Sequence, residues 1–389
     1  MRLPTEADLS KEQREVCNLS ADDINLVIGP PGSGKTVVAV YTRRLLQRME
    51  EEVTATAWNN VLSVYSDMEV TFERWLAKWW RDLTKESFPH KREHDDYMTR
   101  PDYNKAKDKL SQFLEVIRTK NYWGQLIIDE AQDLPVDAHT LLATVQRLSE
   151  SSEKGPSSLL VLADDNQRIT STSASLEEIR QALFLSSDNV YHLRKNYRNT
   201  QEIAKFSSIF YVGTKTGIPE LPERRGDRPR FFKNIKKAAT VDKIVNYAKT
   251  YPNHEIGVLV RYTKQRRSFV YQLEQKLKGT KIKIQTYGAG KEEKANVKKM
   301  KFDTGGVITV LCYASAKGLE FDHVFLPELH NLPLNQDDDK DVERMNMYVM
   351  TSRARNGLTL LMDDAEMQTP LWNLLPGYNQ LSELVDFIE

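Results

Sequence analysis

The sequence predicts an α/β protein with two parallel sheets. Short apolar runs of strand length alternate with amphipathic stretches of helical length along the 389 residues, and such alternation is typical of parallel sheets covered by helices. The length is that of two domains. Gly and Pro gather between residues 213 and 229, which predicts a linker. We therefore expect a first domain over 1–212 and a second over 230–389.

Each predicted strand is an apolar run that punctuating residues or helical stretches bound. In the first domain these runs cover residues 24–28, 53–58, 126–128 and 159–162, and in the second 256–260, 307–311 and 323–326. Polar, aromatic-rich sequence interrupts the first set and predicts a small helical insertion over 64–120. Its Trp75, Trp79 and Trp80 fall on one side of a helix. Packing beneath the insertion is the favoured interpretation, and base stacking is the alternative.

Composition indicates an ordinary globular protein, with 40% hydrophobic and 28% charged residues. The two cysteines, Cys17 and Cys312, are too few for a zinc tetrahedron or a disulfide framework and favour a reducing compartment. No apolar run approaches the roughly 18 residues of a membrane span. The N-terminus shows no signal-peptide pattern. We expect a cytoplasmic protein with no membrane partner.

Charge is unevenly distributed although the net charge is zero. Residues 1–200 carry 26 Lys and Arg against 31 Asp and Glu, whereas residues 224–301 carry 22 against 6. A field of that sign favours a phosphate-bearing partner. The alternative, weighed equally, is that these basic residues form a solvated surface and that the acidic stretch 328–343 offsets their charge. Lys281 and Lys283 alternate with apolar residues, which predicts a half-buried strand with one basic face.

The most specific motif is Gly-Pro-Pro-Gly-Ser-Gly-Lys-Thr at 29–36, between a predicted strand and a helical run over 37–48. Glycines in this context let backbone N–H groups surround a phosphate at a helix N-terminus. Lys35 would reach the β- and γ-phosphates, and the Thr36 hydroxyl would hold Mg²⁺. The motif predicts a nucleoside triphosphate site whose loop includes Gly32, Ser33 and Gly34.

An acidic pair follows the strand predicted at 126–128. It therefore stands at the carboxyl end of a strand, where open α/β sheets bind their ligands. Asp129 can join the Mg²⁺ shell, and Glu130 can orient or deprotonate the water that attacks the γ-phosphorus. Alone the pair is a weak signal. Together with Lys35 it predicts a nucleoside triphosphatase rather than a passive phosphate binder.

The order of the motifs resembles that of superfamily 1 helicases, in particular the UvrD/Rep-like group. Seven segments follow the family's order over most of the chain: a Q-motif-like 9–13, then motif-like segments I to VI at 29–36, 129–133, 162–167, 193–199, 317–321 and 348–354. The resemblance implies two RecA-like domains, with an ATP and Mg²⁺ site in the cleft between them. It also implies a compact member, because no large insertion follows residues 288–290.

The resemblance also implies roles for single residues. Three would contact the nucleoside: Gln13 at the adenine edge, Tyr197 stacked on the adenine, and Glu320 near the ribose. Gln167 would sense the γ-phosphate and Arg198 would contact it. Arg353 would be an arginine finger from the second domain, a device worth on the order of 10³ to 10⁵ in rate.

The nucleic-acid track is marked less clearly. Trp58 and Asn59 stand where motif Ia lies, and Thr71 begins a segment that resembles motif Ib. Trp58 is a candidate stacking platform, worth roughly 1 to 3 kcal/mol per base, or a core tryptophan. Residues 169–172 lack the aromatic residues usual after motif III. Cys312 and Ala314 replace the usual Thr and His of motif V, which puts the coupling between strand contact and hydrolysis in question.

These observations lead to two hypotheses. The first is an ATP-dependent translocase or helicase on single-stranded DNA, with 3′-to-5′ direction implied by the resemblance. The alternative is an ATP-gated switch or loading subunit that controls a protein partner such as a nuclease, with little unwinding. RNA stays open as the track, because no motif reports on a 2′-hydroxyl. We expect no nuclease activity in this chain, since its motif-borne acidic clusters belong to the ATP site.

Overall fold

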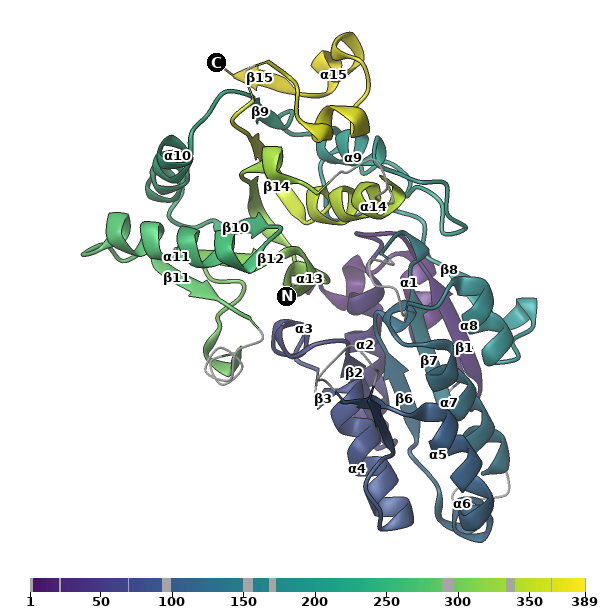
Figure 1. The fold of residues 1–389 in the computed structure, drawn as a ribbon. Helices are drawn as coiled ribbons and strands as arrows, with labels where there is room; N and C mark the ends of the chain where they lie inside the picture. Colours follow the sequence, from purple (N-terminus) through teal and green to yellow (C-terminus); the bar gives the residue numbers. More distant parts are fainter. Residues whose placement is uncertain are drawn as a thin grey trace. The chain divides into compact units, whose positions relative to one another are not determined.

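The chain is described here from a computed structural model, for residues 3–20, 22–68, 70–92, 99–149, 157–167, 173–288, 297–333, 340–364 and 366–388. Contacts within the chain divide it into two compact units. The N-terminal unit comprises residues 3–29 and 34–193, and the C-terminal unit comprises 194–389 with the short segment 30–33. Each unit holds one large sheet, drawn in Figure 1.

The sheet of the N-terminal unit has the order β3-β2-β6-β7-β1-β8, and all of its strands are parallel. The strands are β1 (Ile24–Ile28), β2 (Val53–Ala57), β3 (Val70–Thr71), β6 (Gln125–Ile128), β7 (Ser158–Ala163) and β8 (Val190–His192). The helices outside the insertion are α1 (Lys11–Cys17), α2 (Lys35–Arg48), α3 (Asn60–Tyr65), α7 (Val136–Leu148) and α8 (Leu176–Ala182). The four predicted strands are confirmed to within one residue at each end.

The insertion is mostly helical. It contains α4 (Phe72–Thr84), α5 (Tyr103–Lys109) and α6 (Leu114–Lys120), with an antiparallel pair formed by β4 (His90–Arg92) and β5 (Thr99–Pro101). Trp75 and Trp80 are buried in the hydrophobic core of the unit, and Trp79 packs against it. The Trp75 and Trp79 rings stack at 5.8 Å, and Trp123 meets both edge-on. Packing, the favoured interpretation of these tryptophans, is confirmed.

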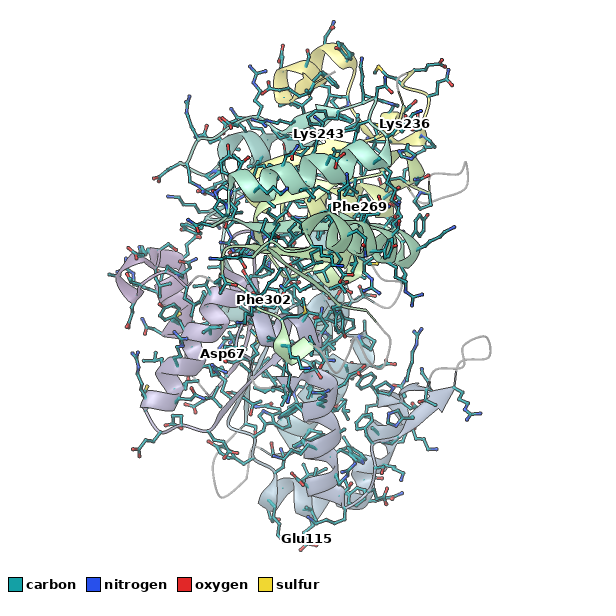
Figure 2. All side chains as sticks on the ribbon, turned by 90° about the vertical axis from the view of Figure 1, so that its left-hand side faces the viewer. Asp67, Glu115, Lys236, Lys243, Phe269 and Phe302 are labelled. Carbon is teal, nitrogen blue, oxygen red and sulfur yellow. The ribbon has the colours of Figure 1, made fainter. Side chains whose placement is uncertain are left out.

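The sheet of the C-terminal unit has the order β11-β12-β10-β13-β14-β9-β15 and is also parallel. The strands are β9 (Arg230–Phe232), β10 (Glu255–Val260), β11 (Lys283–Thr286), β12 (Val307–Cys312), β13 (Phe321–Leu326), β14 (Ala354–Leu361) and β15 (Asp386–Ile388). The helices are α9 (Gln201–Ser208), α10 (Lys237–Thr250), α11 (Thr263–Leu277), α13 (Tyr313–Ala316), α14 (Lys340–Thr351) and α15 (Tyr378–Leu384). Phe269 of α11, labelled in Figure 2, is fully buried in the core.

Both sheets confirm the predicted α/β fold class. No helix in the described ranges combines the length and the apolar character needed to cross a bilayer. Short 3-10 turns complete the two units, among them Val297–Lys299 beside β11.

The division between the units differs from the predicted linker at 213–229. Contacts change from one unit to the other between Leu193 and Arg194, because helix α9 packs against α14 and β14. The backbone N–H of Gly226 donates to a Glu202 carboxylate oxygen at 2.7 Å, which ties the Gly- and Pro-rich segment to α9. The predicted end of the first domain at residue 212 therefore does not match this division.

We predict that Trp80→Ala lowers the free energy of unfolding by about 3 to 5 kcal/mol, the range for a large aromatic side chain removed from a core. Trp80 is fully buried and meets Phe88 and Phe113 edge-on. Chemical denaturation followed by tryptophan fluorescence measures the change. Lys78→Ala, at an exposed position of the same helix, is the control. A stability change no larger than that of the control would contradict the packing role.

Candidate functional site

The glycine-rich loop of the motif at 29–36 begins where β1 ends in the N-terminal unit. The Gly29 N–H donates to the Ala163 carbonyl of neighbouring β7 at 3.2 Å, and Gly34 starts α2 with a φ of +91°, which favours glycine. Lys35, 5% exposed, donates from Nζ to the Gly29 carbonyl at 2.5 Å. The same Nζ lies 3.6 Å from Asp164 Oδ2. The loop therefore holds a buried ammonium group at the N-terminus of a helix.

The acidic pair lies beside this helix. Thr36 Oγ1 donates to Asp129 Oδ2 at 2.6 Å. Asp129 is 1% exposed, and its burial, followed by the charge of Glu130, raises its pKa to about 6. Glu130 has a φ of +55°, in the left-handed region, and accepts a hydrogen bond from Gln132 Nε2 at 2.6 Å. The structure thus brings Lys35, Thr36, Asp129 and Glu130 together, as the sequence predicts.

The residues present fit a Mg²⁺ ion delivered with a triphosphate. Mg²⁺ keeps several waters and takes one or two protein oxygens besides phosphate, and the paired Thr36 hydroxyl and Asp129 carboxylate offer that number. A buried carboxylate with a raised pKa is stabilised by a nearby cation. Among the described residues, no group of three or more His, Cys, Asp and Glu is arranged to hold a metal without such help.

A chain of hydrogen bonds connects Gln167 to Glu130. Gln167 Nε2 donates to Asp164 Oδ2 at 2.8 Å, and the Asp164 N–H donates to Gln132 Oε1 at 3.1 Å. Gln132 in turn donates to Glu130. Burial raises the pKa of Asp164, and the Lys35 charge opposes that shift. Gln132 and Asp164 lie in the motif-like segments 129–133 and 162–167, but the sequence alone predicts no role for them. Their hydrogen bond joins the ends of two strands that are far apart in sequence.

Gln13 lies against the loop. A capping box fixes its side chain: the Ser10 N–H donates to Gln13 Oε1 at 3.0 Å, and the Gln13 N–H donates to Ser10 Oγ at 3.2 Å. A Cβ added at Gly34 would collide with Gln13 Nε2. The amide expected at the adenine edge is therefore buried next to the start of α2, and Gly34 admits no larger residue.

The tip of the loop, residues 30–33, belongs to the C-terminal unit. The Tyr197 N–H donates to the Gly32 carbonyl at 2.9 Å. Gly32 has a φ of +84°, and a Cβ there would lie 2.5 Å from Asn196 Oδ1. The Tyr197 side chain, expected to stack on adenine, is 43% exposed. This segment therefore presents an aromatic ring to solvent directly beside Pro30–Ser33 of the loop.

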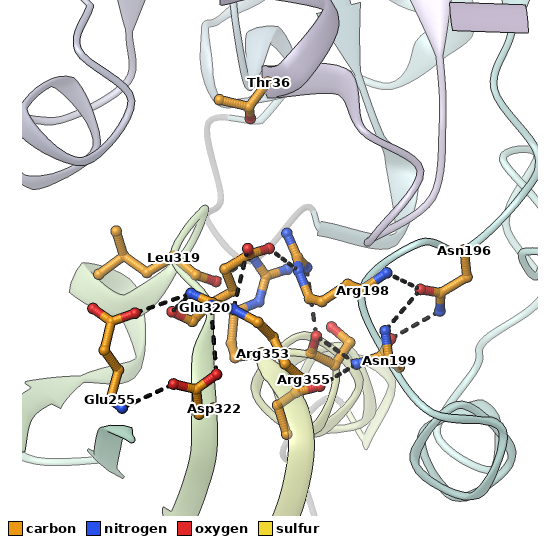
Figure 3. Close-up of polar contacts among 12 residues, drawn as sticks. Thr36, Asn196, Arg198, Asn199, Glu255, Leu319, Glu320, Asp322, Arg353 and Arg355 are labelled. Carbon is orange, nitrogen blue, oxygen red and sulfur yellow. Dashed lines mark hydrogen bonds and ion pairs between the residues drawn. The ribbon is translucent and has the colours of Figure 1, made fainter. Parts of the chain in front are cut away.

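The arginines and the carboxylate of the later motifs gather in the C-terminal unit (Figure 3). Arg198 Nε donates to Glu320 Oε2 at 2.7 Å. The other oxygen of Glu320, Oε1, lies 3.2 Å from Arg355 Nε. Arg355 is itself buried and lies 3.1 Å from a Glu255 oxygen and 3.5 Å from an Asp322 oxygen. Glu320 is therefore shared between two arginines, and sequence reasoning missed Arg355.

Arg353, the expected arginine finger, is 1% exposed. Its Nε donates to the Val349 carbonyl at 2.9 Å, and its Nη1 donates to the Leu319 carbonyl at 3.3 Å. Arg198 reaches the same turn, because its Nη1 donates to the Ser352 carbonyl at 3.4 Å. The structure thus brings Arg198 and Arg353 together in one unit, with the Arg353 guanidinium bound to main-chain oxygens.

The residues proposed for the nucleic-acid track serve local structure. Trp58 is half-buried and packs against the core, and Asn59 Oδ1 caps α3 by accepting from the Leu62 N–H at 2.8 Å. Thr71 is buried at the start of α4. Residues 169–172, where the aromatic residues of the family are missing, lie outside the described residues.

Two parallel sheets covered by helices, with the motif residues at the ends of their strands, define an α/β protein of two units. The chain belongs to the family described as Schlafen group 3, DNA/RNA helicase domain, whose model matches residues 22–326. The finer resemblance to the UvrD/Rep-like group stays a prediction.

Solved structures of helicases are similar to the chain at low identity. The C-terminal domain of a possible DNA helicase from Lactobacillus plantarum is 22% identical, with a TM-score of 0.33, over 50% of this chain and 99% of that one. Bacteroides Pif1 bound to single-stranded DNA is 13% identical, with a TM-score of 0.44, over 96% of both chains. A Pif1 helicase studied at forked double-stranded DNA is 13% identical, with a TM-score of 0.43 and the same coverage. No curated protein matches the chain in sequence.

We predict that Mg²⁺-dependent nucleotide binding weakens as the pH falls from 7 to 5, because Asp129, with a pKa of about 6, takes up a proton in that range. The folded-state pKa lies above the ordinary value of 3.8, so ionisation above pH 6 costs folding free energy. Asp129→Asn should therefore raise the melting temperature at pH 8 and leave it nearly unchanged at pH 3.5, while it removes the Mg²⁺ dependence. Thermal melts and titration with a fluorescent ATP analogue measure both effects. Equal stabilisation at the two pH values would contradict this account.

Proposed function

We propose that this helicase domain hydrolyses ATP with Mg²⁺ and uses the reaction to move along single-stranded DNA in the 3′-to-5′ direction. The observation that carries the proposal is the group formed by the buried Lys35, Asp129 and Glu130 together with Thr36. Its two oxygen ligands, its ammonium group and its second carboxylate supply the parts that hydrolysis of a triphosphate requires. The direction rests on the motif resemblance.

In this proposal the chain's own residues divide the chemistry. Lys35 and the loop backbone hold the β- and γ-phosphates. Thr36 and Asp129 would hold a Mg²⁺ ion, which would supply positive charge to the phosphates. Glu130 accepts the proton of the attacking water, whose oxygen bonds to the γ-phosphorus while the bond to the ADP oxygen breaks. The Gln132 hydrogen bond orients the Glu130 carboxylate for that task.

The hydrogen-bond chain from Gln167 to Glu130 supports a link between nucleotide state and catalysis. Gln167 is the expected sensor of the γ-phosphate, and Asp164 and Gln132 connect it to the catalytic carboxylate. A change at one end of such a network alters the hydrogen-bond geometry at the other. We propose that Asp164 and Gln132 are positioning residues in this link.

A second candidate is an ATP-gated switch that controls a protein partner such as a nuclease. It is favoured by the half-buried packing of Trp58 and the capping role of Asn59, which leave these two track residues engaged in local structure. We further propose a cytoplasmic location for either function. RNA remains an alternative track, in keeping with the family's description as a DNA/RNA helicase domain.

We predict that single-stranded DNA stimulates the ATPase rate, because a motor couples hydrolysis to its track. The rate is measured with no polynucleotide, single-stranded DNA, single-stranded RNA and duplex DNA. Lys35→Ala, which removes the buried ammonium at the loop, should abolish hydrolysis under every condition and serves as the control. Hydrolysis that depends on Lys35 but ignores all four conditions would select the switch.

We predict different stability effects for the two arginines proposed at the γ-phosphate. Arg198→Ala and Arg353→Ala should each lower turnover at least about 100-fold, on the scale of arginine fingers. Only Arg353→Ala should also lower the melting temperature clearly, because it removes a fully buried side chain together with its hydrogen bonds to the Val349 and Leu319 carbonyls. After Arg198→Ala, Glu320 still has Arg355 as a partner. Steady-state kinetics and thermal melts separate these effects, and wild-type turnover in either variant would refute its role.

A further inference from the structure

Five exposed lysines lie at one end of the C-terminal sheet and take no part in the site described above. Strand β11 forms this edge of the sheet, next to β12 (Figure 1). Lys283 lies in β11, Lys281 lies just before it, and the other three are in and after the 3-10 turn Val297–Lys299. We call Lys281, Lys283, Lys298, Lys299 and Lys301 the lysine edge, and all five are exposed.

Alternation places the two strand lysines on one face. Ile282 and Ile284 pack against the hydrophobic core, and successive side chains of a strand point to opposite faces. Lys281 and Lys283 therefore point away from that core. Gln285 shares their face, because it stands two residues after Lys283.

Gln285 also fixes the second segment beside the strand. Its Nε2 donates to the Lys301 carbonyl at 2.9 Å, and its Oε1 accepts from the Lys301 N–H at 2.9 Å. Val297 and Met300 are buried, so Lys298 and Lys299, which lie between them, face solvent. Two stretches of chain separated in sequence thus contribute lysines to the same edge of the sheet.

The positive charge of the lysine edge is not neutralised by the described part of the chain. Within it, no hydrogen bond or ion pair is made by any of the five ammonium groups. The carboxylates nearest in sequence and sheet position, Asp303 and Glu255, lie 3.7 and 3.1 Å from the buried Arg355. Elsewhere in the unit, by contrast, Lys276 pairs with Asp242 at 2.8 Å.

We infer that the lysine edge binds the phosphate backbone of the nucleic acid on which this domain acts, a deduction that rests on the proposed function. Lysine ammonium groups contact phosphates as point charges and carry no direct sequence information. Several unpaired lysines on one edge gain free energy by releasing the counterions of a polynucleotide. The lysine edge is therefore a nucleic-acid contact of the C-terminal unit that does not involve Trp58, Asn59 or Thr71.

The test compares two double variants of equal charge. Lys283→Gln/Lys301→Gln removes two lysines of the lysine edge, and Lys236→Gln/Lys249→Gln removes two exposed lysines at the ends of α10, where Figure 2 labels Lys236. Binding of labelled single-stranded DNA, single-stranded RNA and duplex DNA is measured by fluorescence anisotropy between about 50 and 200 mM salt. ATPase without polynucleotide is measured for both variants.

We expect the variant of the lysine edge to bind single strands about five-fold more weakly per lysine at 0.1 M salt, as a slope of about 0.7 per neutralised phosphate implies. Its log–log salt slope should be smaller by about 0.7 per lysine, with ATPase in the absence of polynucleotide unchanged. The α10 variant should bind like the wild type. Equal binding and equal slopes in the two variants would overturn the inference, even if single strands still stimulate the wild-type ATPase.

Two further results would also overturn the inference. If the wild type binds none of the three polynucleotides, the proposed function and the inference fail together. If the lysine-edge variant keeps its polynucleotide binding but loses binding to phosphatidylserine vesicles, the edge recognises lipid headgroups. The three polynucleotide arms distinguish DNA from RNA as the source of the phosphates.

Discussion

Burial of charge at the carboxyl ends of β1, β6 and β7 is the constraint on which the rest of the structure depends. One ammonium group, on Lys35, and three carboxylates, on Asp129, Glu130 and Asp164, are each at most 5% exposed. Buried charges are expensive unless they are paired, and here acidic groups outnumber the basic one. Burial is the main cause of the raised pKa values of Asp129 and Asp164, and the charge of Glu130 adds to both while Lys35 opposes them. A triphosphate would add more negative charge, so the proposed nucleotide site would need a divalent cation to offset it.

In the C-terminal unit the buried charges form a network of ion pairs around one arginine. Arg355 lies among the carboxylates of Glu255, Asp303, Glu320 and Asp322, and Glu320 accepts Arg198 as well. Breaking a buried ion pair is costly mainly because it leaves one charge alone. Glu320 retains Arg355 when Arg198 leaves, so this arrangement lowers the free energy needed to move the Arg198 guanidinium toward a phosphate. The shared carboxylate thus makes Arg198 the more readily released of the two proposed arginines.

The sequence predicts those parts of the molecule that local chemistry determines. Strands of a parallel sheet are apolar throughout, so the runs at 24–28 and 256–260 are visible without any knowledge of their neighbours. The loop at 29–36 is equally local, since a glycine before Lys35 starts the helix. The division between the units is not local. Glycines and prolines mark turns within a unit and between units alike, and the segment 213–229 belongs to the first kind.

Other features depend on contacts between distant residues, which one sequence does not reveal. The Asp164 N–H donates to Gln132, which follows the end of another strand. The Arg353 side chain is buried, and the carbonyls of Leu319 and Val349 accept its hydrogen bonds. Counts of charged residues give the sign of the charge in each segment, but they do not show whether the charged side chains are buried or exposed. Part of the acidic charge of the N-terminal half is buried, at Asp129, Glu130 and Asp164, whereas the five lysines of the lysine edge are exposed. At 0.1 M, salt largely screens interactions between exposed charges more than about 10 Å apart, but it screens buried charges much less. Ionic strength should therefore act on nucleic-acid binding far more strongly than on the buried Lys35 and Asp129, which makes salt a means of separating the two activities.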